Sequence, residues 1–178
     1  GSRGDNFGFT ATYDEDGNAY SGGVVYETGF PVTTGAFQSF FKGTSAFAER
    51  NKFGQIDAAI LKYAPDGKSL VYATYLGGYD GLDYPHSMVV DTNGYLLIMG
   101  TTSSDDFPMP SNEAFDDSHN GLSDIFLARL SKDGTQLLHS TYLGGENYDG
   151  QNGSSAPSPL WTSNTHFNYS DEFRGEII

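Results

Sequence analysis

The sequence contains no cysteine, and this absence excludes several kinds of site at once. Without thiols the chain has no disulfide framework and no cysteine ligands for zinc or an iron–sulfur cluster. Basic residues are also scarce, because 9 Lys and Arg stand against 23 Asp and Glu, which gives a formal net charge of −14. So acidic a chain repels nucleic acid and anionic membranes, and we expect neither as a partner.

Long hydrophobic runs are missing as well. No apolar segment of the sequence reaches the roughly 18–20 residues of a membrane-spanning helix, so we expect no membrane insertion. Glycine is abundant instead, with 23 residues among 178, and aromatic residues make up 15% of the chain. This composition is too aromatic for a disordered chain and favours many short strands joined by tight turns.

The sequence consists largely of two copies of one pattern. Each copy contains, in the same order, an Asp-x-x-Gly turn, Phe-Pro, Ala-Phe, an Asp before an apolar run, a second Asp-Gly turn and Thr-Tyr-Leu-Gly-Gly. These landmarks begin at Asp14, Phe30, Ala36, Asp57, Asp66 and Thr74 in the first copy, and at Asp91, Phe107, Ala114, Asp124, Asp133 and Thr141 in the second. Since so many landmarks do not fall in one order by chance, we expect a repeat architecture.

Each copy reads as four short strands, with no room for long helices. The expected strands are 9–13, 19–24, 58–63 and 70–75 in the first copy, and 87–90, 95–100, 125–130 and 136–142 in the second. Residues 88–90 and 96–99 are apolar without alternation, which predicts that both faces of their sheet are covered. We therefore expect an all-β fold of two consecutive four-stranded antiparallel β-propeller blades. The alternative, a two-layer sandwich, predicts alternation in every strand.

The repeat also sets the expected boundaries of the units. We expect the first blade at 5–82, with an insert near 45–54, and the second blade at 83–150. Residues 151–170 read as a linker or surface insert, and 171–178 resemble the first strand of a third blade. A closed propeller needs about four to eight blades. The sequence is therefore expected to be a fragment of a larger ring, with further blades of the same parent chain as partners.

The repeated motifs resemble the SBBP family of bacterial β-propeller repeats. The resemblance rests on Asp14–Tyr20, Phe30–Gln38 and Asp57–Gly78, and on their second copies at Asp91–Tyr95, Phe107–Asp116 and Asp124–Gly145. The amino-acid sequences of residues 8–23 and 171–178 are similar to segments of large surface proteins of Bacteroidota that are exported by type IX secretion.

This resemblance implies an extracellular or outer-surface location and a role without catalysis, as a scaffold, adhesin or interaction module. Some members of the family are linked to gliding motility. The partners that it implies are a protein or glycan at the cell surface and the secretion machinery. The family has no agreed catalytic residues to transfer to this sequence, and we expect no enzymatic activity.

The first turn resembles half of a calcium-binding loop. Asp14, Asp16 and Asn18 have calcium-ligand side chains at alternate positions, but the twelfth position of such a loop is Val25 rather than a carboxylate. The second copy keeps only Asp91-Thr92-Asn93-Gly94. A plain hairpin turn is therefore the favoured interpretation, with calcium as the alternative and no other cofactor or metal expected.

The loops after each Leu-Gly-Gly mix aromatic residues with acids and amides, a composition that suits sugar rings. The candidate ligand-binding residues are Tyr79, Asp80 and Asp83 in the first loop, and Asn147, Tyr148 and Asp149 in the second. A lectin-like propeller that uses these loops is thus the alternative to a scaffold. A carbohydrate-active enzyme that uses the acidic doublets Asp105-Asp106 and Asp116-Asp117 is less favoured, because the first copy lacks them.

Overall fold

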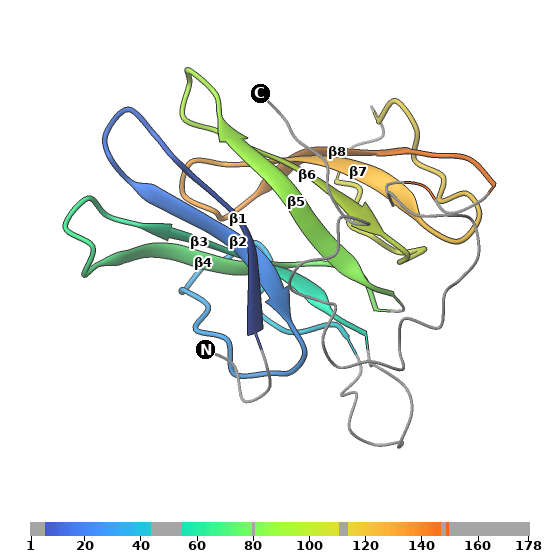
Figure 1. Ribbon diagram of the computed structural model, residues 1–178, viewed down its shortest axis with the longest axis horizontal. Coiled ribbons are helices and arrows are strands. Elements are labelled where there is room, and N and C mark those ends of the chain that lie inside the picture. Colours follow the sequence, from blue (N-terminus) through green and yellow to red (C-terminus); the bar gives the residue numbers. More distant parts are fainter. Residues whose placement is uncertain (1–5, 44–54, 80, 111–113, 147–148, 150–178) are drawn as a thin grey trace.

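The computed structural model describes residues 6–43, 55–79, 81–110, 114–146 and 149, and this part of the chain is all-β (Figure 1). Its strands form two four-stranded antiparallel sheets that follow one another along the chain. The predicted fold class is therefore confirmed, and the two sheets do not close into a ring. Among these residues no helix is long and apolar enough to cross a membrane. The expected insert at 45–54, linker at 151–170 and third-blade strand at 171–178 lie outside the described residues.

Within each sheet the strands are paired in the order of the sequence. The first sheet contains β1 (Asn6–Tyr13), β2 (Ala19–Val25), β3 (Asp57–Tyr63) and β4 (Leu70–Leu76). The second sheet contains β5 (Asp83–Val90), β6 (Leu96–Thr102), β7 (Asp124–Leu130) and β8 (Leu137–Leu143). Both β1 and β5 begin earlier than expected, because a register shift lets the chain continue pairing beyond an irregular residue. Pro85 lies at that shift, on an edge strand, where a missing N–H is tolerated.

The turns between the first two strands of each sheet have the predicted form. Gly17 and Gly94 adopt positive φ angles of 80° and 83°, which a residue with a side chain rarely adopts. Their N–H groups donate to the carbonyl oxygens of Asp14 and Asp91 at 3.0 and 2.8 Å. The same local chemistry therefore sets both hairpins.

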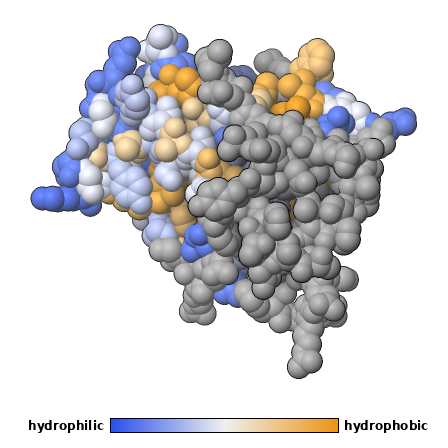
Figure 2. All heavy atoms as spheres, in the orientation of Figure 1, coloured by the Kyte–Doolittle hydropathy of each residue, from blue (hydrophilic) through white to orange (hydrophobic). Residues whose placement is uncertain are grey.

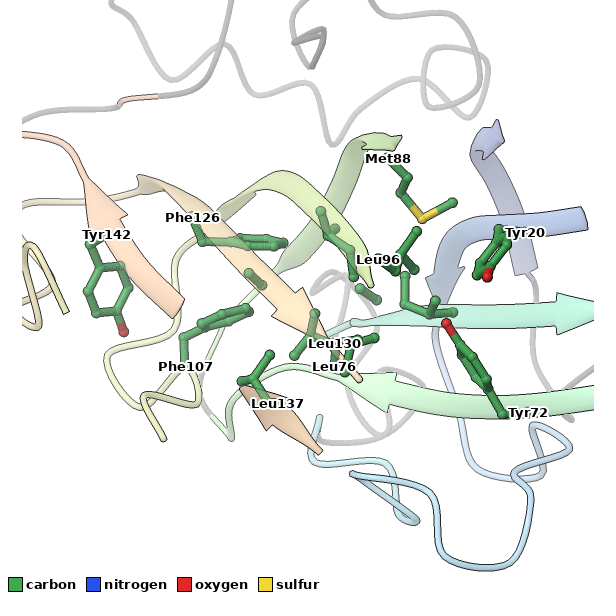
Figure 3. Close-up of a cluster of buried hydrophobic side chains, with 14 residues drawn as sticks. Tyr20, Tyr72, Leu76, Met88, Leu96, Phe107, Phe126, Leu130, Leu137 and Tyr142 are labelled. Atoms are coloured by element: carbon green, nitrogen blue, oxygen red, sulfur yellow. The ribbon is translucent and has the colours of Figure 1, made fainter. Parts of the chain in front are cut away.

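A hydrophobic core joins the two sheets (Figure 3). The first sheet contributes Tyr20, Ala58, Ile60, Tyr72 and Leu76, and the second contributes Met88, Leu96, Ile98, Phe126, Ala128, Leu130, Leu137 and Tyr142, with Phe107 from the β6–β7 loop. β5 lies against β1, β2 and β3, so the second sheet begins directly on the first. Burial of this apolar surface stabilises the pair by about 25 cal/mol for each Å² removed from water.

The two sheets use opposite sides for this contact. Ile60 of β3 faces the second sheet, whereas its repeat equivalent in β7 is Leu127, which is not part of the shared core. Phe126 faces the first sheet, and its equivalent, Ala59, faces away into a separate cluster. The sheets are thus stacked head to tail. This is the packing of successive propeller blades, whereas a sandwich related by a two-fold axis would bring equivalent sides together.

The outer edge of each sheet is covered by its own long loop. The loop between β2 and β3 runs along β4, where the N–H of Thr33 donates to the carbonyl of Ala73 at 3.1 Å and Tyr75 donates to Gln38 at 3.1 Å. In the second sheet Tyr142 donates to Asp116 at 3.0 Å in the same way. These bonds satisfy strand edges that would otherwise invite pairing with other chains.

Burial on both sides of the strands is seen in the first sheet, although the prediction was made for residues 88–90 and 96–99 of the second. The consecutive residues Ala58, Ala59 and Ile60 are 0%, 3% and 0% exposed. In the second sheet Leu96 and Ile98 are buried, but Leu97 and Met99 are only half-buried, so the prediction for 96–99 is wrong in this part of the chain. The physical reason is that no other described strand packs on the outer side of the second sheet.

Candidate functional site

The loops β2–β3, β4–β5 and β6–β7 meet at one end of the two sheets and form a small exposed patch. Tyr79 and Phe40 are 51% and 53% exposed, and their ring centroids lie 6.5 Å apart. The Lys42 ammonium lies 5.3 Å from the centre of the Tyr79 ring. Asp106 accepts a hydrogen bond from the backbone N–H of Tyr79 at 2.7 Å. We call these four residues the Tyr79 patch; it combines a flat apolar surface with one cation and one carboxylate.

Two buried aspartates hold the loops beneath this patch. Asp57, the first residue of β3, accepts hydrogen bonds from the Gln38 amide at 2.7 Å and from the Lys42 N–H at 2.9 Å. Asp83, the first residue of β5, accepts from Thr102, Ser104 and Gly78 at 2.5, 3.0 and 3.0 Å. Each carboxyl group thereby ties its strand to a loop.

Burial dominates the ionisation of both groups. Desolvation raises the pKa of Asp57 to about 6, although hydrogen bonds from Lys42, Gly43 and Gln38 and the nearby Lys42 charge act in the opposite direction. It raises the pKa of Asp83 to about 7, against the hydrogen bonds from Thr102, Gly78 and Ser104. The charge of Asp57 raises the pKa of Asp83 further.

The Leu-Gly-Gly motif allows this arrangement by its lack of side chains. A Cβ atom on Gly77 would lie 2.5 Å from Oδ2 of Asp83 and 2.9 Å from Oδ1 of Asp57. A Cβ atom on Gly78 would collide with Asp106 and with Ser104. The glycines are therefore needed because the chain passes tightly between acidic side chains.

The ligand-binding residues predicted from the sequence do not form one exposed site in the described part of the structure. Tyr79 is exposed in the patch, whereas Asp83 is fully buried and bonded to protein donors. In the second loop, Oδ2 of Asp149 accepts from the Gly145 N–H at 2.7 Å. Asp80, Asn147 and Tyr148 lie outside the described residues.

The calcium candidates lie at the opposite end of the first sheet, in the β1–β2 turn. Figure 2 shows hydrophilic residues gathered on that side, at the left, where Figure 1 places the β1–β2 and β3–β4 turns. The Asp14 carboxylate accepts from the Asn18 backbone and amide at 2.8–3.0 Å and from the Tyr20 hydroxyl at 2.9 Å. Lys62 lies 3.3 Å away. Asp16 is exposed.

These contacts determine the ionisation of Asp14. Although burial acts to raise it, the hydrogen bonds from Asn18, Tyr20 and Lys62 lower the pKa of Asp14 to about 2. The carboxylate is therefore charged and already supplied with protein donors. Within the described ranges, no group of three or more His, Asp or Glu side chains is arranged to hold a metal ion.

The acidic doublets differ in their environments. The Asp105 side chain is 89% exposed and lies 3.2 Å from Nδ1 of His119. Asp106 instead bonds the backbone of Tyr79. Asp116 accepts from the backbone and hydroxyl of Ser118 at 2.9 and 2.6 Å, which lowers the pKa of its carboxyl group. Each of these three acids therefore has a neighbour that accounts for its position.

Sequence reasoning missed Phe40, Lys42 and Asp57 as parts of this end of the molecule. Phe40 and Lys42 gave no signal, since the second copy has no equivalent aromatic and lysine in its loop. Asp57 did carry a signal, because an aspartate opens the third strand in both copies, at Asp57 and Asp124. A charged residue that starts a buried strand twice indicates a structural or ligand-binding role.

Comparison with protein families gives one match. Residues 71–108 match the SBBP family model, described as a beta-propeller repeat. The matched segment begins in β4, crosses the junction between the sheets, and ends in the β6–β7 loop. No curated protein matches the chain.

Proposed function

We propose that this chain is a non-catalytic β-propeller segment that serves as scaffold and interaction module in a large exported bacterial protein. The head-to-tail stacking of the two sheets is the observation that carries this proposal. In this stack the outer side of the first sheet is covered by Phe30, Val32 and Phe41 of its own β2–β3 loop, whereas the outer side of the second sheet is only half-buried, and a side of that kind is stabilised when a further unit covers it. The SBBP match at residues 71–108 supports the same interpretation.

The partner of the second sheet is a further blade of the parent chain. The outer side of this sheet carries half-buried apolar residues, namely Leu97, Met99, Ile125, Leu127 and Leu143. Their repeat equivalents in β3 and β4 include Ala58, Ile60 and Leu76, each 0% exposed against the second sheet. A following blade that repeats Phe126 and Tyr142 would therefore fit this side as the second sheet fits the first.

An outer-surface location and export by type IX secretion are the finer parts of the proposal. They are supported by the resemblance of residues 8–23 and 171–178 to exported proteins of Bacteroidota. Mass spectrometry of the surface and released fractions of the source cell tests both location and parent length. A parent polypeptide with several more repeats is expected, and an intracellular product of only these two units would contradict the proposal.

Glycan binding at the Tyr79 patch is a second candidate function, because exposed aromatic rings beside charged groups suit sugar rings. A glycan array with the propeller-containing protein tests it. Tyr79→Ala and Phe40→Ala are expected to abolish any binding, whereas Tyr13→Ala, which removes a ring that is 78% exposed in the β1–β2 hairpin, should leave it unchanged. Binding that survives both patch substitutions would reject the site.

A further inference from the structure

The aspartate that opens the third strand has an unusual environment in both sheets. In Asp57 and Asp124 one carboxylate oxygen, Oδ2, accepts a backbone N–H from the preceding loop, of Lys42 at 2.9 Å and of Asn120 at 2.8 Å. The other oxygen, Oδ1, is buried in both residues and has no hydrogen-bond partner. Such oxygens are rare in folded proteins, and their recurrence at equivalent positions indicates a ligand rather than an accident.

A second aspartate follows each sheet in an equivalent position. Oδ2 of Asp83 accepts the N–H of Gly78 at 3.0 Å, and Oδ2 of Asp149 accepts the N–H of Gly145 at 2.7 Å. The backbones match as well, since Asp83 N donates to Ile56 O at 3.0 Å and Asp149 N donates to Ser123 O at 2.8 Å. Asp149 therefore occupies, after the second sheet, the place that Asp83 occupies after the first.

The two aspartates of the first junction converge on Gly77. Oδ1 of Asp57 and Oδ2 of Asp83 both lie within 3 Å of the place where a Cβ of Gly77 would be, at 2.9 and 2.5 Å. Both side chains are fully buried. Two ionised carboxylates in such a place would repel each other in a medium of low polarity, so one of them binds a positive charge.

The hydrogen bonds indicate where that charge belongs. Asp83 has three donors, Thr102, Ser104 and Gly78, which suit a carboxylate anion. Oδ1 of Asp57 has none, which suits a protonated oxygen that donates. The charged or titratable groups around the pair are Lys42 on the Asp57 side, Tyr75 of β4, Tyr84 of β5, Tyr142 of β8, and Asp106 next to Gly78.

We propose that Asp57 and Asp83 share one proton across Gly77, so that the junction between the sheets is a proton-binding site that strengthens in a mildly acidic medium. No metal ion is required, because the proton needs no ligands beyond the two carboxyl groups. Asp124 and Asp149 begin the same arrangement at the outer side of the second sheet.

The direction of the pH effect follows from burial. Burial raises the pKa of both carboxyl groups above the ordinary value of 3.8, so the folded pair holds a proton that the unfolded chain releases. Stability therefore falls as the pH rises from about 4 to about 7. For one shared proton the unfolding equilibrium constant rises about tenfold per pH unit within this window.

Urea unfolding of the 178-residue chain at several pH values between 4.5 and 7.5 tests the proposal. The wild type is expected to show this slope, and Asp57→Asn to lose it, because the neutral amide imitates the protonated group at every pH. Asp117→Asn is the matched control, since it removes one exposed carboxylate and leaves the junction intact. Equal slopes in Asp57→Asn and Asp117→Asn would overturn the proposal.

Infrared spectroscopy of the wild-type protein provides a test that needs no variant to fold. At pH 6 a carbonyl band of a protonated carboxyl group is expected, which shifts in heavy water and disappears by pH 8. Its absence at pH 6 would overturn the proposal. So would calcium in excess that stabilises the wild type at pH 7.5 and leaves Asp57→Asn unchanged, since a metal ion would then occupy the junction.

Discussion

The two sheets have nearly the same sequence pattern but different burial. Ala58, Ile60 and Leu76 of the first sheet are each 0% exposed, whereas their repeat equivalents Ile125, Leu127 and Leu143 are half-buried. The strands do not differ in hydrophobicity enough to cause this. The difference shows that in a stacked repeat the neighbour, and not the strand itself, determines whether an apolar side chain is buried.

The largest expected loss of stability comes from placing a charge at Ile60, and the same change at its repeat equivalent, Leu127, provides the comparison. Ile60→Asp would bury an unpaired carboxylate between the sheets and cost about 4 kcal/mol or more of the free energy of unfolding. Leu127→Asp places the same charge on the outer side and should cost about 1 kcal/mol. Urea unfolding followed by circular dichroism measures both.

A comparable cost for the two substitutions would show that the outer side of the second sheet is covered in solution. Size-exclusion chromatography of the wild type then decides whether a second copy provides the cover. In that case Leu127→Asp should shift the elution toward a smaller species without loss of secondary structure.

The next largest effect on stability is expected at Phe126, which lies in the core between the sheets, whereas its repeat equivalent Ala59 lies on the outer side of the first sheet. Phe126 stacks on Phe107 with ring centroids 4.4 Å apart and is fully buried, so Phe126→Ala should cost about 3–5 kcal/mol. The equivalent Ala59 lies beside Phe30 and Tyr75, and Ala59→Phe should cost about 1–3 kcal/mol by overpacking. Thermal unfolding checks both values, and a stabilising Ala59→Phe would contradict the description of that cluster.

A smaller effect is expected from an ion pair that occurs once in each sheet. Asp14 and Lys62 lie 3.3 Å apart with side chains 10% and 11% exposed, whereas Asp91 and Arg129 lie 2.6 Å apart with side chains 21% and 31% exposed. Asp14→Asn should therefore lower Tm more than Asp91→Asn, because the more buried lysine loses its partner. Parallel thermal melts at neutral pH measure this difference.

The pH dependence of this pair has the opposite sign to that of the buried aspartates. Hydrogen bonds outweigh burial and lower the pKa of Asp14 to about 2, so its contribution is present above the ordinary value of 3.8 and is lost as the pH falls through about 2. The difference in Tm between the wild type and Asp14→Asn should therefore become smaller below pH 3. An unchanged gap would show that the ion pair does not form in solution.

Much of the fold could be predicted from the sequence because its signals are local. Gly17 and Gly94 mark hairpins through the φ angles that they allow, and repeated motifs align the strands of one sheet with those of the other. The early starts of β1 and β5 were missed, because a bulge breaks the alternation on which strand prediction depends. The half-burial of Leu97 and Met99 was missed because it depends on what lies beyond them.

The candidate site was less predictable. Tyr79 could be identified as a loop aromatic, but its contact with Phe40 joins residues of two loops, and no local pattern encodes that distance. Asp83 was predicted to bind a ligand because it is an acidic residue close to Tyr79 in the sequence. In the structure it is instead enclosed by Thr102 and Ser104. A sequence shows which side chains can ionise, but tertiary packing decides which of them reach solvent.

Because each sheet contacts the next one through opposite sides, the stack of blades has a direction. Every added unit presents the same free surface as the one before it, so gene duplication can lengthen such a protein without inventing a new interface. Only the ring closure between the last unit and the first restricts the number of units, and that limit is geometric rather than chemical. Evolution can therefore vary the loops of single blades while the contacts between blades stay constant.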